Sequence, residues 1–165
     1  MADISNSNLF KNGTGILKKN ACIVLVKTEW NAAITDALET GCKTVFDQEG
    51  ITKIKTLVVP GAVEIPFAIK HHWENSSHRQ QPDAYIALGC VIRGGTPHFE
   101  YVCQSVTAGI AQLNLLLPVP TIFGVLTLDD EKQARERIGG KHGHKGEEAA
   151  ITALKMIAFS RNLKK

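Results

Sequence analysis

The sequence predicts a three-layer α/β sandwich, in which helices cover both faces of a four-stranded parallel sheet. Four mainly apolar runs of strand length lead to this prediction, and each is followed by a segment whose apolar residues fall at helical spacing. These runs are 21–26, 54–59, 84–92 and 121–126. Runs that are apolar throughout indicate strands buried on both faces, as in parallel sheets. The 165 residues suit one domain, which we expect to consist of an N-terminal extension, 1–20, and a core, 21–165.

The first two strand-helix units are marked by turn and capping residues. After the first run, Asn31 is a plausible N-cap for a helix. The second run ends at Pro60 and Gly61, which form a turn signal. The helix expected over 62–73 has Pro66 in its first turn, where the missing N–H costs nothing.

The remaining units follow the same pattern. After the third run, Thr96 is expected as the N-cap and Pro97 as the first residue of a helix. The fourth run is followed by acidic residues, 129–131, which complement the positive N-terminus of a helix. An amphipathic helix over about 147–161 completes the predicted fold.

Composition excludes several broad classes of protein. The chain is 44% hydrophobic and 21% charged, and no apolar run approaches the roughly 20 residues needed to cross a membrane. A net charge of +3 is too small to indicate nucleic-acid binding. Residues 1–10 do not resemble a secretory signal, so we expect a cytoplasmic protein. The four cysteines lack metal-ligand spacing and are interpreted as small buried hydrophobes.

The turn after the third run is the first candidate site. Ligands of open parallel sheets bind beyond the carboxyl ends of the strands. There, Gly94, Gly95 and Thr96 lead into a helix, and two glycines let backbone N–H groups approach an anion at the positive helix end. The alternative is that this stretch is only a well-capped turn.

His98 lies within the first turn of the same helix. The local field there disfavours the imidazolium, which leaves a neutral ring able to accept or donate a proton. A lone histidine is often structural, but this one stands beside a candidate anion site at a strand end. The functional interpretation is therefore favoured.

Two further strand-end residues have two interpretations each. Trp30 follows the first strand and could stack on a planar heterocycle, or could act as a hydrophobic staple for the next helix. Glu64 follows the second strand and could accept hydrogen bonds from hydroxyls, or could stabilise the helix N-terminus. The residues themselves do not separate these interpretations.

A basic segment, 135–145, precedes the last helix. It could be a solvated loop, and a zinc site at His142 and His144 would need further ligands that no nearby residue supplies. A phosphate clamp by Arg137 is more economical, because a guanidinium binds phosphate oxygens through two hydrogen bonds.

Four motifs together resemble the 6,7-dimethyl-8-ribityllumazine synthase family. They are PGAVEIPFA (60–68), LGCVIRGGTPHFEYV (88–102), PTIFGVLT (120–127) and ERIGGKHGHKGEEAA (136–150). The resemblance runs from about 21 to 156, in the family's order and spacing. Agreement of four motifs makes accident improbable.

The resemblance implies a flavodoxin-like fold and the penultimate step of riboflavin biosynthesis. In that step 5-amino-6-(D-ribitylamino)uracil condenses with 3,4-dihydroxy-2-butanone 4-phosphate, and phosphate and water are released. The family uses no metal or organic cofactor. The resemblance also implies assembly into pentamers and, in some members, into shells of twelve pentamers, with active sites between subunits. Riboflavin synthase is a candidate partner. The uninterrupted loop 139–146 favours a shell weakly.

The resemblance also assigns roles to matching positions. The pyrimidinedione and ribityl chain are expected to contact Trp30, Asn31, Ala62, Val63, Glu64, Cys90, Val91, Ile92 and the Phe123 backbone. The phosphate is expected at Gly95, Thr96 and Arg137, with His98 as acid and base and Lys145 and Glu148 as further catalytic positions. Trp30 stands where many relatives have Phe, which preserves stacking.

Two other functions compete with this one. The first is a shell of the same family that binds or stores flavin with little catalysis. His98 and Arg137 argue against it, because binding alone needs no acid or base beside a phosphate site. The second is an unrelated flavodoxin-like module for phosphate or nucleotides, which leaves the agreement of four motifs unexplained.

Overall fold

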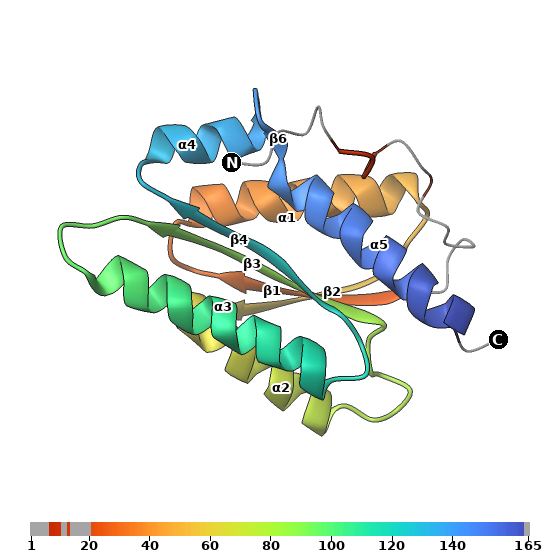
Figure 1. Cartoon of the computed structure of the whole chain (residues 1–165). Helices are drawn as coiled ribbons and strands as arrows, with labels where there is room; N and C mark the ends of the chain where they lie inside the picture. Colours follow the sequence, from red (N-terminus) through yellow and green to blue (C-terminus); the bar gives the residue numbers. More distant parts are fainter. Residues whose placement is uncertain (1–6, 11–12, 14–20, 164–165) are drawn as a thin grey trace.

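The computed structural model describes residues 7–10, 13 and 21–163 and contains the predicted sheet (Figure 1). Its four strands are all parallel, in the order β2-β1-β3-β4. Their bounds are β1 Cys22–Thr28, β2 Lys53–Val59, β3 Ala84–Ile92 and β4 Thr121–Leu128. The predicted extension 1–20 lies outside the described residues except for 7–10 and 13.

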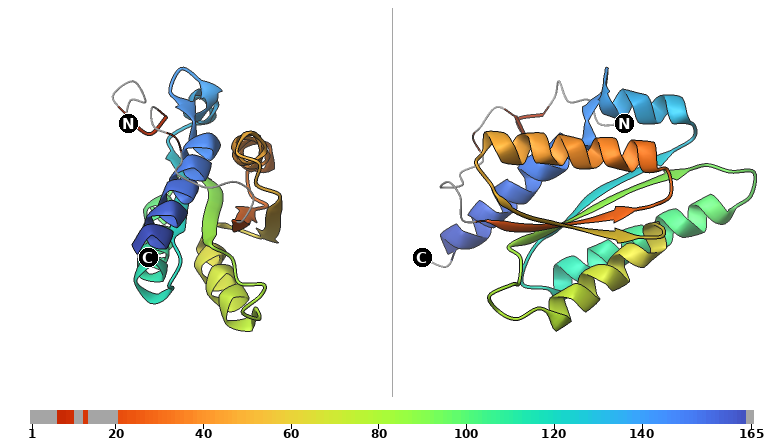
Figure 2. Two further views of the ribbon diagram at one scale, coloured as in Figure 1. Left: turned by 90° about the vertical axis from the view of Figure 1, so that its right-hand side faces the viewer. Right: turned by 180° about the vertical axis from the view of Figure 1, so that it is seen from behind.

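Helices cover the two faces of the sheet, as predicted (Figures 1 and 2). The helices α1 (Ala32–Gln48), α4 (Glu131–Arg137) and α5 (Lys145–Leu163) lie on one face. The helices α2 (Ile65–Asn75) and α3 (His98–Leu116) lie on the other, with a short 3₁₀ turn, η2 (Ala62–Glu64), before α2. The fold is therefore a three-layer, flavodoxin-like α/β sandwich. None of the helices within 7–10, 13 and 21–163 is long and apolar enough to cross a membrane.

Strand β1 shows why the apolar runs predicted a buried sheet. Ile23 and Leu25 pack into the core beneath α1 and α5, while Val24 and Val26 pack into a second core beneath α2 and α3. Successive side chains of a strand point to opposite faces, so a strand between two helical layers must be apolar at every position. This arrangement fixes β1 and β3 at the centre of the molecule.

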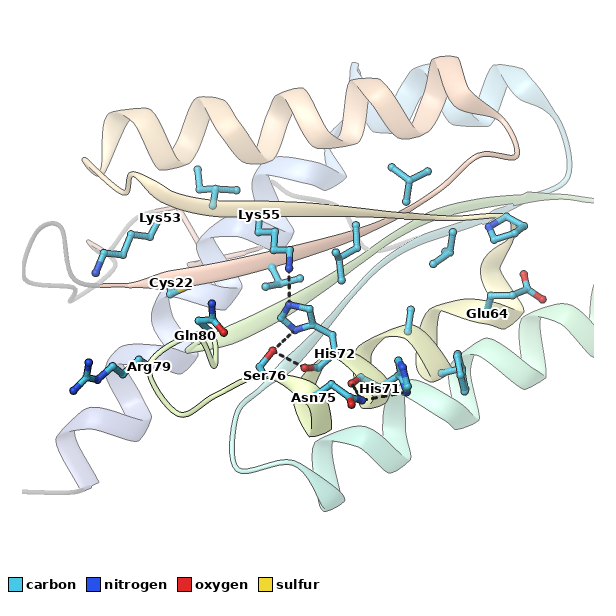
Figure 3. A pocket seen from close by; sticks show the side chains of 18 residues that line it. Cys22, Lys53, Lys55, Glu64, His71, His72, Asn75, Ser76, Arg79 and Gln80 are labelled. Atoms are coloured by element: carbon cyan, nitrogen blue, oxygen red, sulfur yellow. Dashed lines mark hydrogen bonds between the residues drawn. The ribbon is translucent and has the colours of Figure 1, made fainter.

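The edge strand β2 departs from this pattern. Lys53, Lys55 and Val58 are exposed, and a cleft of about 1040 Å³ lies between β2 and α2 (Figure 3). In that cleft the Lys55 Nζ atom lies 3.1 Å from His72 Nε2, and His72 Nδ1 lies 2.8 Å from the buried Tyr85 hydroxyl. The helices cover both faces of the sheet as predicted, but they leave β2 partly uncovered, because it is an edge strand with one neighbour and α2 packs over β1.

Helix boundaries differ in several places from those predicted. Thr96 is not the N-cap of α3, because the helix begins at His98 with Pro97 in the capping position. Asn31 does occupy the N-cap position of α1, but its side chain makes no capping hydrogen bond. Helix α5 begins at Lys145, two residues before the predicted start. A small antiparallel pair, β5 (Ile138–Gly140) and β6 (Gly143–His144), was not predicted.

Candidate active site

The first group of predicted site residues gathers at the carboxyl edge of the sheet. These residues lie at the end of β3 or in the segments that follow β1, β2 and β3, which are adjacent in the sheet in the order β2-β1-β3. We call them the strand-end group: Trp30, Asn31, Ala62, Val63, Glu64, Cys90, Val91, Ile92, Gly95, Thr96 and His98. The location agrees with the rule that ligands of open parallel sheets bind beyond the carboxyl ends of the strands.

The loop carrying Trp30 is tied to both neighbouring strands. The Trp30 amide donates to the Pro60 carbonyl at 3.3 Å, which holds the loop against the end of β2. Asn31 adopts a left-handed conformation with φ of 57°, and its amide Nδ2 donates to the Cys90 carbonyl at 2.9 Å. Asparagine tolerates this conformation better than most residues. The asparagine therefore joins β1 to β3, while Trp30 remains 73% exposed.

The side chains of Trp30 and Glu64 both lie next to the position that a side chain on Gly61 would occupy. A Cβ atom on Gly61 would lie 2.9 Å from Glu64 Oε2 and 3.5 Å from Trp30 Cδ1. Glu64 is exposed and borders the cleft of Figure 3, whereas Ala62 is buried and Val63 is partly exposed beside it. A planar aromatic surface and a carboxylate thus flank a residue that has no side chain of its own.

The end of β3 forms the inner wall of this group. Cys90 is buried, and Val91 and Ile92 are half-buried. Burial raises the pKa of the Cys90 thiol to about 11, and the charge of Glu131 adds to the rise. The thiol is therefore protonated at neutral pH, which suits a wall residue rather than a nucleophile.

The turn between β3 and α3 is open. No atom lies within 4 Å of a Cβ built on Gly94 or Gly95, so no packing within the described residues demands glycine at these two positions. Thr96 and His98 are exposed, and His98 is the first residue of a helix of 19 residues. Free backbone N–H groups at a helix start form a suitable environment for an anion.

A second group lies on α4, the β5–β6 pair and the start of α5. Arg137 is only 7% exposed, and its guanidinium forms an ion pair with Glu148, with N–O distances of 2.8 and 3.0 Å. The same guanidinium donates to the His142 carbonyl, and Lys145 Nζ lies 3.4 Å from Glu148 Oε2. Glu148 Oε1 is within ion-pair distance of Arg137, although its orientation is not that of a hydrogen bond. We call Arg137, Lys145 and Glu148 the ion-paired group.

Phe123 belongs with the ion-paired group. It lines a cavity of about 490 Å³ together with Lys145 and Glu148. In the sheet, Phe123 pairs with Ala87, three positions before Cys90, which is about 10 Å along the strand at the usual rise. No hydrogen bond or ion pair within the described ranges links this group to the strand-end group. The predicted site residues therefore form two separate sets in one chain.

His144 has a structural environment rather than a metal-binding one. Its ring packs directly against Gly41 of α1, and its Nδ1 accepts a hydrogen bond from the Gly146 amide at 3.2 Å. Across 7–10, 13 and 21–163, no cluster of three or more His, Cys, Asp and Glu side chains is arranged to hold a metal ion. His144 attaches the β5–β6 pair to α1, so it supports the ion-paired group.

Arg93 was not singled out from the sequence. It immediately follows β3 and contacts Asp129, Glu100 and Phe99, which come from two other segments. The available signal was an arginine before two glycines, with acidic residues soon after the next strand and in the next helix.

The fold is that of a flavodoxin-like α/β protein, and its candidate site lies at the carboxyl edge of the parallel sheet. Comparison with known proteins identifies the family. A family model described as 6,7-dimethyl-8-ribityllumazine synthase matches residues 20–161. The protein of that name from Bacteroides fragilis is 47% identical over 143 residues, covering 86% of this chain and 97% of the relative. Those from Porphyromonas gingivalis and Parabacteroides distasonis are 47% and 46% identical, over 87% and 84% of this chain and 88% and 85% of the relatives.

The chain belongs to the 6,7-dimethyl-8-ribityllumazine synthase family. The resemblance drawn from the four motifs is thereby confirmed. The unrelated phosphate or nucleotide module is excluded, because the family match spans the sheet and all of the motif positions.

Proposed function

We propose that this protein condenses 5-amino-6-(D-ribitylamino)uracil with 3,4-dihydroxy-2-butanone 4-phosphate, releasing phosphate and water. One observation carries the proposal: Trp30 and Glu64 flank Gly61 at the strand ends, beside the open turn that holds Gly95, Thr96 and His98. An aromatic surface and a carboxylate suit a heterocycle with a hydroxylated chain, and the turn suits a phosphate. The names of the relatives agree with this reaction.

Each residue of the strand-end group then has a role. Trp30 stacks on the pyrimidinedione, and Glu64 accepts hydrogen bonds from the ribityl hydroxyls. Ala62, Val63 and the end of β3, Cys90 to Ile92, line the ribityl pocket, and Asn31 fixes the loop beside it. Gly95 and Thr96 hold the phosphate through backbone N–H groups.

The chemistry requires proton transfers but no covalent bond to the enzyme. The 5-amino group attacks the ketone and expels a first water to form an imine, phosphate is eliminated, the resulting enol tautomerises to a ketone, and the ribitylamino nitrogen attacks that carbonyl and closes the ring with loss of a second water. His98 is placed beside the phosphate turn, where it can accept a proton in one step and return it in another. Holding two substrates side by side supplies much of the remaining acceleration.

We also propose that the complete site forms between two copies of the chain. Arg137, Lys145, Glu148 and Phe123 lie apart from the strand-end group, so a neighbouring copy supplies them to complete the phosphate and ring contacts. Such an interface joins two different patches, and repeated contacts of this kind close into a ring when the rotation between neighbours divides a full turn. A pentamer is the ring we propose, with twelve pentamers forming a shell.

The same proposal covers the domain organisation, the location, the cofactor requirement and the partner of the protein. Residues 1–165 act as one domain in the cytoplasm, the substrates are the two small molecules named above, and no cofactor is used. Riboflavin synthase, which consumes the lumazine, is the proposed partner.

One assay tests the reaction. The purified protein is incubated with both substrates, and lumazine is followed by its absorbance and fluorescence. Product formation is expected. A folded protein that binds riboflavin but forms no lumazine would instead be a flavin-storage shell.

The shared site has its own test. Two variants, His98→Ala in the strand-end group and Glu148→Gln in the ion-paired group, are each expected to lose most activity. When they are mixed under conditions that exchange subunits, some interfaces pair an intact strand-end group with an intact ion-paired group, and activity is expected to return. No recovery despite proven subunit exchange would show that each site lies within one chain.

A further inference from the structure

Arg93 makes contacts that join three segments around the phosphate turn. Its backbone amide donates to the Leu128 carbonyl at 2.8 Å, which extends the pairing of β3 with β4 by one residue. Its Nε atom donates to Asp129 Oδ1 at 2.8 Å, and Nη1 pairs with Glu100 Oε1. The guanidinium carbon also lies 4.2 Å from the centroid of the Phe99 ring.

These contacts enclose the turn from both ends. Arg93 stands immediately before Gly94, while Phe99 and Glu100 come immediately after His98. The segment between them includes the two glycines at which an added Cβ would meet no atom within 4 Å. Because packing does not hold this segment there, its conformation depends on the contacts at its ends.

The positive charge of the Arg93 guanidinium is already balanced by neighbouring carboxylates. Hydrogen bonds from Arg93 lower the pKa of the Asp129 and Glu100 carboxyl groups, so both carry negative charge at neutral pH. One cation between two carboxylates has little net charge left to offer a phosphate. The planar fork of arginine suits such a bridging role better than lysine does.

We propose that Arg93 is a positioning residue, which clamps the β3–α3 turn to Asp129 and to the first turn of α3 and so sets the geometry of Gly95, Thr96 and His98. This inference rests on the proposed function of that turn. Ion pairs as exposed as these contribute little to global stability. The clamp therefore acts on ligand geometry, and its loss is visible in phosphate binding and turnover rather than in unfolding.

The test compares Arg93→Met, Arg93→Lys, Asp129→Asn and Glu100→Gln, with Arg135→Met as a control. Arg135 is an exposed arginine on α4 that lies 4.0 Å from Glu131. The readouts are kcat, KM for each substrate, binding of inorganic phosphate by calorimetric titration, and the thermal midpoint by circular dichroism.

We expect Arg93→Met to raise KM for the phosphorylated ketone and lower kcat, each by roughly tenfold, since small misplacements of reacting groups are costly. KM for the pyrimidine and the thermal midpoint should stay near the wild-type values, and Arg93→Lys should be intermediate. Asp129→Asn and Glu100→Gln should weaken phosphate binding in the same direction. Combined with Arg93→Met, they should add little further loss, because all of them break one clamp.

Two results would overturn the clamp. If Asp129→Asn or Glu100→Gln tightens phosphate binding, the freed guanidinium is a direct phosphate ligand. If Arg93→Met leaves both phosphate binding and kcat unchanged, Arg93 has no part in the turn. A wild-type protein without lumazine synthase activity would contradict the proposed function instead, and the phosphate titrations would still test the clamp.

Discussion

The strand-end group and the ion-paired group differ in how they are held before any ligand arrives. Trp30, Glu64 and His98 have exposed side chains beyond the strand ends, and backbone hydrogen bonds fix the segments that carry them rather than the side chains themselves. The buried Arg137 is paired with the half-buried Glu148, and the β5–β6 pair packs on α1 through His144 and Gly41. One group is shaped to receive a ligand, while the other is assembled by folding.

The contrast has an energetic basis. A buried charge is tolerated only when it is paired, so the ion-paired group is coupled to the stability of the chain. Exposed side chains at strand ends are uncoupled from stability and free to serve binding. Substitutions in the ion-paired group should therefore lower stability as well as activity, whereas substitutions in the strand-end group should lower activity alone.

The largest stability effect is expected from Glu148→Ala. Removing the carboxylate leaves the Arg137 guanidinium buried and without its ion-pair partner, which should lower the free energy of unfolding by about 3–5 kcal/mol. Urea unfolding followed by circular dichroism measures this. Arg135→Met is the control, because Arg135 lies on α4 like Arg137 but its side chain is 81% exposed, and it should change stability by less than about 0.5 kcal/mol. Equal losses of unfolding free energy in Glu148→Ala and Arg135→Met would show that the ion-paired group is not coupled to stability.

The largest activity effect is expected from His98→Ala. Loss of the acid and base should lower turnover by roughly 100-fold or more. The unfolding free energy should change by less than about 0.5 kcal/mol, because the side chain is exposed. Steady-state rates of lumazine formation give the first quantity and urea unfolding the second. His78→Ala, an exposed histidine in the segment before β3, should leave turnover at the wild-type level. Unchanged turnover in His98→Ala would remove this residue from the mechanism.

Trp30→Ala should have a smaller and more selective effect. Loss of the stacking surface should raise KM for the pyrimidine by about five- to tenfold, since an aromatic pair contributes roughly 0.5–1.5 kcal/mol. KM for the phosphorylated ketone should change little. Trp30→Phe is the conservative control and should behave like the wild type. A loss of stability in place of the KM effect would identify Trp30 as a hydrophobic staple for α1.

The smallest effect is expected for the pH dependence of stability, through Glu39 of helix α1. Glu39 of α1 pairs with Lys27 of β1 at 2.6 Å and accepts a hydrogen bond from Thr56 of β2 at 2.8 Å. Burial alone raises the pKa of the Glu39 carboxyl, but hydrogen bonds from Lys27, Lys43 and Thr56 outweigh it and lower that pKa from 4.5 to about 2.

A carboxyl group whose pKa is lowered by folding stabilises the protein above its unfolded pKa and loses that contribution as the pH falls. Stability from Glu39 should therefore decline between about pH 4.5 and 2. Thermal midpoints measured across this range should fall less steeply in Glu39→Gln than in the wild type. Parallel profiles would show that other carboxylates govern acid unfolding. Glu74→Gln on α2, whose side chain is half-exposed, is the control and should leave the slope unchanged.

Some elements followed from the sequence because their causes are local. The run 84–92 is buried at nearly every position, as its unbroken apolar composition predicted. Pro66 lies in the first turn of α2, as expected. The prediction of Thr96 as the N-cap was wrong, because Pro97 itself occupies the N-cap position of α3. Asn31 does lie at the N-cap position, as predicted, but not because its side chain caps the helix. The side-chain amide donates instead to the Cys90 carbonyl of β3.

The sequence by itself determined the α/β class, the order of strands and helices, and the loops where binding residues stand. Apolar runs and helical spacing encode these features within a few neighbouring residues. Only the tertiary structure decided that Arg137 is buried against Glu148, that β2 is left partly uncovered, and that Arg93 bridges two strand ends. Those facts depend on which distant segments meet in space, and spacing along the chain carries no direct record of such contacts.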